Sequence, residues 1–252
     1  MSLSLKVDTG GTYTDAVLIR DESDVIASAK ALTTRYDLAE GIGEAVSAVL
    51  APAAVDPAQV TLASLSTTLA TNALVEGQGE RVGLILIGFR DADLQKHGLA
   101  EALGGDPVVV LAGGHDHAGG EKAPLDEAVL RRWLTEHGDE VSGFAVAAQF
   151  ATRNPAHEQR ATAMVVELTG RPVSASHHLS AKLNGPKRAL TAVLNARLIG
   201  MIDRLISRAE VRLGELGVTA PLMVMRGDGA LISAKFARER PIETILSGWD
   251  AR

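Results

Sequence analysis

The 252-residue sequence predicts an α/β protein, and three observations carry that prediction. Short apolar segments alternate with amphipathic helical segments along most of the chain, which is typical of the α/β class. The segment from Arg81 to Ile87 is too apolar for a strand with one wet face, so it indicates a sheet covered on both sides. The composition, 46% hydrophobic and 22% charged, is that of a globular protein long enough to bury a sizeable core.

Charge and cysteine content exclude several classes of protein. The 25 basic and 31 acidic side chains give a net charge of −6, which argues against a nucleic-acid-binding surface. The absence of cysteine excludes a disulfide scaffold and thiolate metal sites, and it fits a cytoplasmic location. No run approaches the ~18 apolar residues of a spanning helix, and Lys6 and Asp8 interrupt the first apolar stretch, so we expect neither a signal peptide nor membrane insertion.

The first two predicted strands enclose the most informative stretch of the chain. Apolar and polar residues alternate from Ser2 to Val7, which predicts a strand with one buried face, and Ala16 to Ile19 reads as a second strand. Between them, Asp8 to Asp15 reads DTGGTYTD. Gly10 and Gly11 allow a backbone with φ > 0 and leave no Cβ in the way of a ligand.

The chemistry of this turn suits a nucleotide. Its amides and the hydroxyls of Thr9, Thr12 and Thr14 suit phosphate oxygens. The carboxylates of Asp8 and Asp15 would repel phosphate unless a divalent cation lies between them. The residues therefore favour a Mg-nucleotide site, and an ordinary hairpin turn is the alternative.

The following elements lead to a second polar segment. We expect a strand from Asp24 to Leu32, a helix from Asp37 that ends before Pro52, and a strand from Thr61 to Leu65. From Ser66 to Gly77 we expect a helix that Ser66 or Thr67 caps and Gly77 ends. This helix would bring four polar side chains toward one end and face: Thr67, Thr68, Thr71 and Asn72. Helix capping with a polar edge is the alternative interpretation.

The middle of the chain continues the alternation of strands and helices. We expect strands at 108–111, 143–150 and 172–176, helices at 127–137 and 155–168, and a polar strand exit at His177 and His178. In the glycine-rich loop from Gly113 to Gly120, the residues His115, Asp116 and His117 are candidate metal ligands. Because metal sites normally need three or four protein ligands, a solvated turn is the alternative.

A long helix dominates the last part of the chain. Pro186 suits a helix start, and apolar residues then recur at steps of three and four until Gly217. Asn195 within it is expected to be a buried amide with a structural partner, and a position near an interdomain cleft is the alternative. A strand at 221–225, a turn at 227–229 and a helical turn at 234–238 follow.

Several of these segments resemble one protein family. DTGGTYTD resembles the first phosphate loop of the actin, sugar-kinase and Hsp70 ATPase superfamily, and it is most similar to that of the hydantoinase A and 5-oxoprolinase family. Further matches occur in the expected order from Lys6 to Gly248: TTLATNAL at 67–74, GGH at 113–115 with PLD at 124–126, TAVLNA at 191–196 and RPIET at 240–244. The resemblance implies an actin-like, ribonuclease H-like domain with a mixed sheet at 1–182. It also implies the incomplete start of a second ATPase domain at 183–252.

The resemblance also implies roles for the residues of the loop. Gly10, Gly11, Thr12 and Thr14, beside Thr9, would cradle the phosphates of ATP. Asp8 would hold Mg through water and Asp15 would orient the loop or the metal. The residues Thr67, Thr68, Thr71 and Asn72 would line the substrate cleft.

The family implies an ATP-dependent hydrolase. Its members use ATP to activate the oxygen of a cyclic amide or imide, such as a hydantoin or 5-oxoproline, by phosphorylation, and a hydantoinase B-type partner subunit completes hydrolysis. Related carboxylases activate ketones and bicarbonate.

Two departures qualify this expectation. The sequence lacks the second glycine-rich phosphate loop of the superfamily, so we expect a truncated subunit, and residues 183–188 lack an expected Glu-Arg pair. Because phosphoryl transfer depends on positioning and charge stabilisation, the loss of one loop matters. A non-catalytic fragment or an assembly module is therefore the alternative function.

Overall fold

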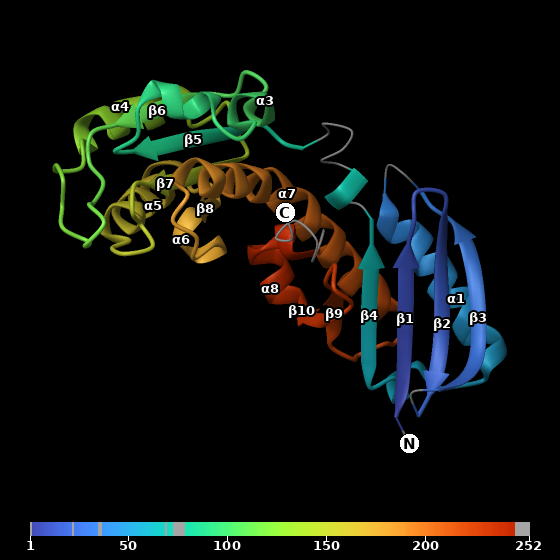
Figure 1. Ribbon diagram of the computed structural model, residues 1–252. Coiled ribbons are helices and arrows are strands. Elements are labelled where there is room, and N and C mark those ends of the chain that lie inside the picture. The colour runs from blue at the N-terminus through green and yellow to red at the C-terminus, as the bar shows by residue number, and fades with distance from the viewer. Residues whose placement is uncertain (1, 22, 35–36, 69, 73–78, 245–252) are drawn as a thin grey trace. The chain divides into compact units, whose positions relative to one another are not determined.

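The structure, a computed structural model, describes residues 2–21, 23–34, 37–68, 70–72 and 79–244 (Figure 1). Contacts divide the chain into two compact units. The first unit joins Met1–Gln78 with Met201–Arg252, and the second unit is Gly79–Gly200. The division predicted from sequence, 1–182 and 183–252, concerns the architecture of the whole family and stays a prediction.

The first unit is built on a six-stranded mixed sheet with the order β10-β9-β4-β1-β2-β3. β1 pairs with β2, β2 with β3, and β9 with β10 in antiparallel fashion, whereas β4 is parallel to β1 and to β9. The strand bounds are β1 Leu3–Thr9, β2 Tyr13–Arg20, β3 Asp24–Leu32, β4 Leu62–Thr67, β9 Leu222–Met225 and β10 Leu231–Ser233. The mixed sheet confirms the predicted fold class.

Helix α1, Leu38–Ala53, covers the buried face of β1, β2 and β3 (Figure 1). The alternation in β1 places Leu3, Leu5, Val7 and Thr9 on this face. Further helical segments of the unit are η1 Pro57–Gln59, α8 Ala234–Glu239, η3 Pro241–Thr244 and the second part of helix α7 (Gly185–Glu215), from Met201 onward.

The second unit contains a four-stranded, fully parallel sheet with the order β6-β5-β7-β8. Its strands are β5 Val82–Ile87, β6 Val108–Leu111, β7 Gly143–Ala148 and β8 Val173–Ala175. Every residue of β5 and β7 is buried, as expected for a sheet covered on both faces. Its helical segments are η2 Asp91–Gln95, α3 Leu99–Leu103, α4 Glu127–His137, α5 Ala156–Thr169, α6 Ser176–Leu179 and the first part of α7, Gly185–Glu215.

Two cores form on the two faces of this parallel sheet. On one face Ile85 and Ile87 pack with α4 and α5 through Trp133 and Met164. On the other face Leu84 and Leu86 pack with α3 and α7. Within α7, Asn195 is buried and donates from Nδ2 to Ser174 Oγ at 2.9 Å, which confirms the predicted structural amide.

Three local predictions are wrong, and several short elements were not predicted. Strand β4 continues through Ser66 and Thr67, which therefore do not cap the following helix. α1 passes its predicted end and retains Pro52 in its last turn. His177 and His178 lie in α6 and not at a strand exit, because Glu158 accepts a hydrogen bond from the His177 amide. η2, α3 and β10 were not predicted.

In the part of the chain that the structure describes, no helix combines the length and apolar content that crossing a bilayer requires.

Candidate functional site

The connection between β1 and β2 is a tight, exposed loop. Its last strand pair is Thr9 with Thr14, and the Gly10 amide donates to the Tyr13 carbonyl at 3.0 Å. Neither Gly10 nor Gly11 adopts the left-handed backbone expected from the sequence. A Cβ on Gly10 would lie 3.2 Å from the Tyr13 carbonyl oxygen, whereas a Cβ on Gly11 would meet no heavy atom nearer than Asn72 Nδ2 at 4.0 Å, so the space beside Gly11 is open.

The loop offers unused donors, and a free carboxylate precedes it. Within the described residues, the amides of Gly11 and Thr12 donate no hydrogen bond. Asp8 is exposed and its carboxylate has no hydrogen-bond or ion-pair partner there either. Free amides suit phosphate oxygens, and a free carboxylate beside them suits the water shell of a divalent cation. The residues present therefore fit a metal-bound phosphate group.

Thr33, which follows β3, holds the loop from its inner side. Its Oγ1 donates to the Gly10 carbonyl at 2.9 Å, and its amide donates to the Thr12 carbonyl at 2.9 Å. The Thr14 hydroxyl is buried and lies 3.0 Å from Thr33 Oγ1. Sequence reasoning missed Thr33, and the only signal for it was its position directly after the strand expected at 24–32. Thr14 therefore bonds within the protein, whereas the amides of Gly11 and Thr12 donate no hydrogen bond among the described residues.

Two further loop residues have distinct surroundings. Thr9 is buried, and its Oγ1 has no hydrogen-bond partner among the described residues. Asp15 is the cross-strand neighbour of Asp8, so both side chains stand on one face of the sheet. The Asp15 carboxylate pairs with Lys30 Nζ at 3.1 Å, and Lys30 also lies over the Tyr13 ring. This exposed ion pair engages the Asp15 carboxylate, whereas the Asp8 carboxylate has no such partner among the described residues.

The second polar segment lies directly beside the loop. The parallel register of β1 and β4 pairs Asp8 with Ser66 and Thr9 with Thr67. The Thr68 amide then approaches the Thr9 carbonyl at 3.4 Å, and Asn72 Nδ2 donates to Thr68 Oγ1 at 3.3 Å. Thr68 and Asn72 are exposed, and Thr71 is partly buried in the same helical turn. The structure thus brings together two segments that are separated by more than fifty residues.

A close helix–strand approach supports the Thr33 contact and yields a prediction. A Cβ on Gly41 in α1 would lie 2.8 Å from the Leu32 carbonyl and 3.5 Å from Thr33 Cα. We expect Gly41→Ala to lower the free energy of unfolding by about 1–2 kcal/mol, because overpacking against backbone outweighs the gain in helix propensity. Urea denaturation of the two proteins measures this difference.

Gly43→Ala is the matched control on the same helix. Its Cβ would meet only the flexible side chain of Arg212, at 3.3 Å or more. We expect the stability of this variant to change by less than about 1 kcal/mol, because the helix gains propensity and the side chain can move. Equal stability of the two variants would contradict the close approach at Gly41.

The glycine-rich loop of the second unit does not bring its three candidate ligands together. His115 is buried against the ring of His157, with centroids 4.5 Å apart, and burial lowers its pKa. Asp116 closes the turn by accepting from the amides of Ala118 and Gly120, and His117 is exposed. Among the described residues, no group of three or more acidic and histidine side chains could hold a metal ion.

The same unit contains a buried ionic cluster that sequence reasoning did not find. Glu158, fully buried in α5, accepts from Ser176 Oγ at 2.6 Å and from His177 Nδ1 at 2.5 Å. Arg188 is also buried, and its Nε donates to Ser176 Oγ at 3.3 Å. The sequence shows His157 and Glu158 only as an incomplete zinc-protease motif, so their separate structural roles were not visible.

The fold and the loop define a family, which the sequence comparisons also show. The model of the hydantoinase/oxoprolinase N-terminal region matches residues 4–169, and that of hydantoinase/oxoprolinase matches residues 188–252. The chain therefore belongs to the hydantoinase/oxoprolinase family.

Two curated relatives are similar to this chain over most of its length. It is 29% identical to caprolactamase subunit alpha of Pseudomonas jessenii over 97% of this chain and 38% of the relative. It is 31% identical to the acetophenone carboxylase gamma subunit of Aromatoleum aromaticum over 77% of this chain and 31% of the relative. The chain thus spans less than two-fifths of the length of the relatives that it matches.

Two solved structures share the fold. The ATP-dependent caprolactamase of Pseudomonas jessenii superposes with a TM-score of 0.80 at 29% identity, over 97% of this chain and 38% of that one. A nucleotide-free acetone carboxylase superposes with a TM-score of 0.82 over 98% of this chain and 39% of that one. At 23% identity, the second likeness concerns the fold alone.

Proposed function

We propose that this chain supplies a phosphate loop to an ATP-dependent enzyme that activates an amide or ketone carbonyl oxygen by phosphorylation. The observation that carries this proposal is the outer side of the β1–β2 loop. The exposed Asp8 carboxylate has no partner among the described residues, the amides of Gly11 and Thr12 donate no hydrogen bond there, and Thr68 and Asn72 adjoin the loop. One relative is a caprolactamase subunit, one is a carboxylase subunit named for a ketone, and a solved caprolactamase is described as ATP-dependent.

Each residue has a physical role in this proposal. Asp8 would hold Mg²⁺ through its water shell, and the amides of Gly11 and Thr12 would donate to phosphate oxygens. Thr33 and the buried Thr14 keep the loop in place, so these donors are oriented before the nucleotide binds. Asp15 is fixed by Lys30, and Gly10, Thr9 and Thr67 set the backbone around the loop. When bound, Mg-ATP supplies the phosphoryl group and neutralises its charge.

The substrate class and the partner are finer parts of the same proposal. A cyclic amide is favoured because the caprolactamase relative matches nearly the whole chain. Hydantoin and 5-oxoproline are members of the same chemical class. Thr68, Thr71 and Asn72 would line the cleft that receives it. Both relatives are named as subunits, which supports the presence of a partner subunit. We propose that this partner is of the hydantoinase B type.

ATP hydrolysis by the complete enzyme tests the proposal. Turnover should fall to background when the Asp8 carboxylate is removed, and unchanged turnover would refute the assignment.

A non-catalytic assembly module is the second candidate function. It is favoured by the presence of a single loop of the DTGGTYTD kind in this sequence. Binding of Mg-ATP to the chain separates the two candidates, since an assembly module needs no nucleotide.

A further inference from the structure

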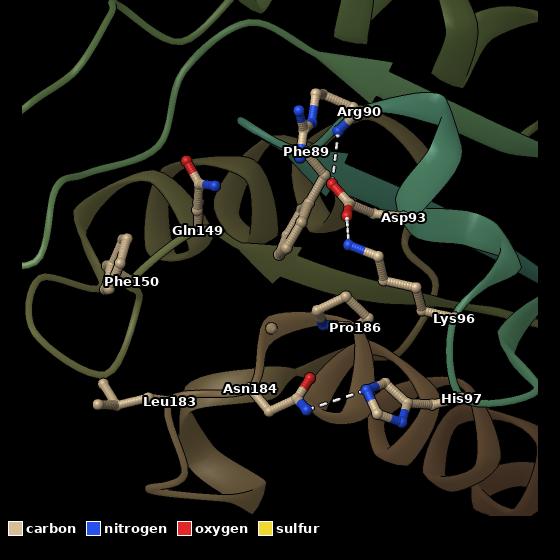
Figure 2. A pocket seen from close by; sticks show the side chains of 11 residues that line it. Phe89, Arg90, Asp93, Lys96, His97, Gln149, Phe150, Leu183, Asn184 and Pro186 are labelled. Atoms are coloured by element: carbon tan, nitrogen blue, oxygen red, sulfur yellow. Dashed lines mark hydrogen bonds and ion pairs between the residues drawn. The ribbon is translucent and has the colours of Figure 1, made fainter.

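The second unit contains a cavity of about 340 Å³, far along the sequence from the phosphate loop (Figure 2). Three segments line it: residues 89–97 after β5, Gln149 and Phe150 after β7, and residues 183–186 at the start of α7. All three belong to the second unit. The volume lies within the range of pockets that hold small organic molecules.

The topology of the parallel sheet places this cavity where α/β proteins bind ligands. In the order β6-β5-β7-β8, the chain leaves β5 to one side for β6 and then returns to the other side for β7. The carboxyl ends of β5 and β7 therefore meet at a topological switch point, which leaves a crevice between the two connections. Phe89 follows β5 closely, and Gln149 follows β7 directly, so both residues stand at this crevice.

Unusual backbone conformations occur at the same cavity. Phe150 has φ of 54° and His97 has φ of 57°, in the left-handed region that bulky side chains rarely adopt. Four non-glycine residues of the described chain have positive φ, and two of them line this cavity. Such conformations persist where the surrounding structure enforces them, and they concentrate at ligand sites.

The side chains combine apolar walls with a positive charge. Phe89 and Phe150 provide aromatic surface, and Leu183 at the rim is 56% exposed. Among the described residues the Arg90 guanidinium forms no hydrogen bond and no ion pair, although its charge contributes, after Lys96, to holding the pKa of Asp93 below its usual range. Lys96 Nζ, in contrast, pairs with the Asp93 carboxylate at 2.6 Å, and that carboxylate also accepts from the Arg90 amide at 3.0 Å.

The start of α7 adds to this positive character. Asn184 accepts from the Lys187 amide at 3.2 Å and donates from Nδ2 to His97 Nε2 at 2.9 Å (Figure 2). It thereby caps a 31-residue helix whose first residues line the cavity. The N-terminal end of a helix favours a negative group. With two cationic side chains and one satisfied carboxylate, the cavity suits an anion although the whole chain carries a net charge of −6.

We propose that this cavity binds a small organic carboxylate, whose acid group pairs with Arg90 and whose apolar part contacts Phe89 and Phe150. Apolar walls favour an organic acid over inorganic phosphate, and the unpaired guanidinium favours an acid over a neutral molecule. Ring opening of a cyclic amide and carboxylation of a ketone both form a carboxylate. That connection rests on the proposed function, whereas the site itself does not.

Titration of the full chain with hexanoate, followed by amide NMR shifts, tests this site. We expect saturable binding with shifts at residues 89–97 and 149–150, and at least tenfold weaker binding of hexan-1-ol and of inorganic phosphate. Arg90→Gln should weaken hexanoate binding at least fivefold, whereas Arg132→Gln, an exposed control on α4, should not. Asp8→Ala should leave hexanoate binding unchanged, which keeps this test separate from that of the phosphate loop.

A second variant separates loss of the binding site from loss of the fold. Phe150→Gly removes the aromatic wall and also removes the conformational strain at φ 54°. We expect weaker hexanoate binding with no loss of stability in urea. Equal affinities for hexanoate and hexan-1-ol, no saturable hexanoate binding, or unchanged affinity in Arg90→Gln or Phe150→Gly would overturn the proposal.

Discussion

Replacing Asp8 with alanine is expected to reduce ATP hydrolysis by the complete enzyme at least 100-fold, to the background rate. Within the described residues the Asp8 carboxylate has no partner of its own, so its removal should leave the fold intact. Phosphoryl transfer depends on positioning and on neutralising charge at the phosphates. A 100-fold loss corresponds to about 2.7 kcal/mol of transition-state stabilisation, a modest demand on a residue that holds a metal ion.

The measurement is steady-state phosphate release at saturating Mg-ATP. Asp24→Ala is the matched control, because Asp24 is an exposed aspartate on β3 of the same sheet and forms only a loose ion pair with Arg20 at 3.6 Å. We expect this control to retain wild-type turnover, and both variants to unfold at the wild-type urea concentration. Normal turnover in Asp8→Ala would contradict the proposal that the β1–β2 loop takes part in phosphoryl transfer.

Removing Glu158 should destabilise the second unit by about 3–5 kcal/mol. Its carboxylate is fully buried and accepts from the amides of Ala148 at 2.7 Å and His177 at 2.9 Å, beside Ser176 and the His177 ring. Burial lowers the pKa of Arg188, and the charge of Glu158 opposes that shift. Glu158→Ala would leave the Arg188 charge buried without its counter-ion, and four donors without an acceptor.

Urea denaturation of the chain measures this effect, with two further variants for comparison. Glu158→Gln keeps the shape and one acceptor oxygen, so we expect a smaller loss of about 1–3 kcal/mol. Glu167→Ala removes an exposed carboxylate from the same helix and should change stability by less than about 0.5 kcal/mol. If the free energy of unfolding of Glu158→Ala were within about 1 kcal/mol of the wild-type value, the proposed stabilising role of the buried cluster would be contradicted.

The sequence predicted the elements whose signal is local. The strands at 24–32 and 108–111 and the helix at 127–137 have the predicted bounds, because hydrophobic periodicity and capping residues determine them within a few positions. Predictions were wrong where a distant partner decides the conformation. β4 extends through Thr67 because it pairs with Thr9 of β1, and α6 forms where Glu158 binds the His177 amide.

The loop between β1 and β2 has a signal in the local sequence, whereas the residue that supports it does not, and its role as a phosphate loop stays a prediction. Asp8 and the two glycines lie within four consecutive residues, and the composition of the TTLATN segment at 67–72 itself predicts a polar helical segment. Thr33 reaches the loop only through the register of β2 and β3. The cavity of the second unit combines segments around residues 89, 149 and 184, and no local pattern connects them.

Calorimetric titration of this chain with Mg-ATP tests most directly whether the β1–β2 loop receives a metal-bound triphosphate. We expect heat that fits a micromolar affinity, that disappears when EDTA removes the metal, and that is lost in Asp8→Ala. Heat of the same size in Asp8→Ala would contradict the assignment of the loop. No heat from the wild-type chain would contradict it too, in favour of an assembly module.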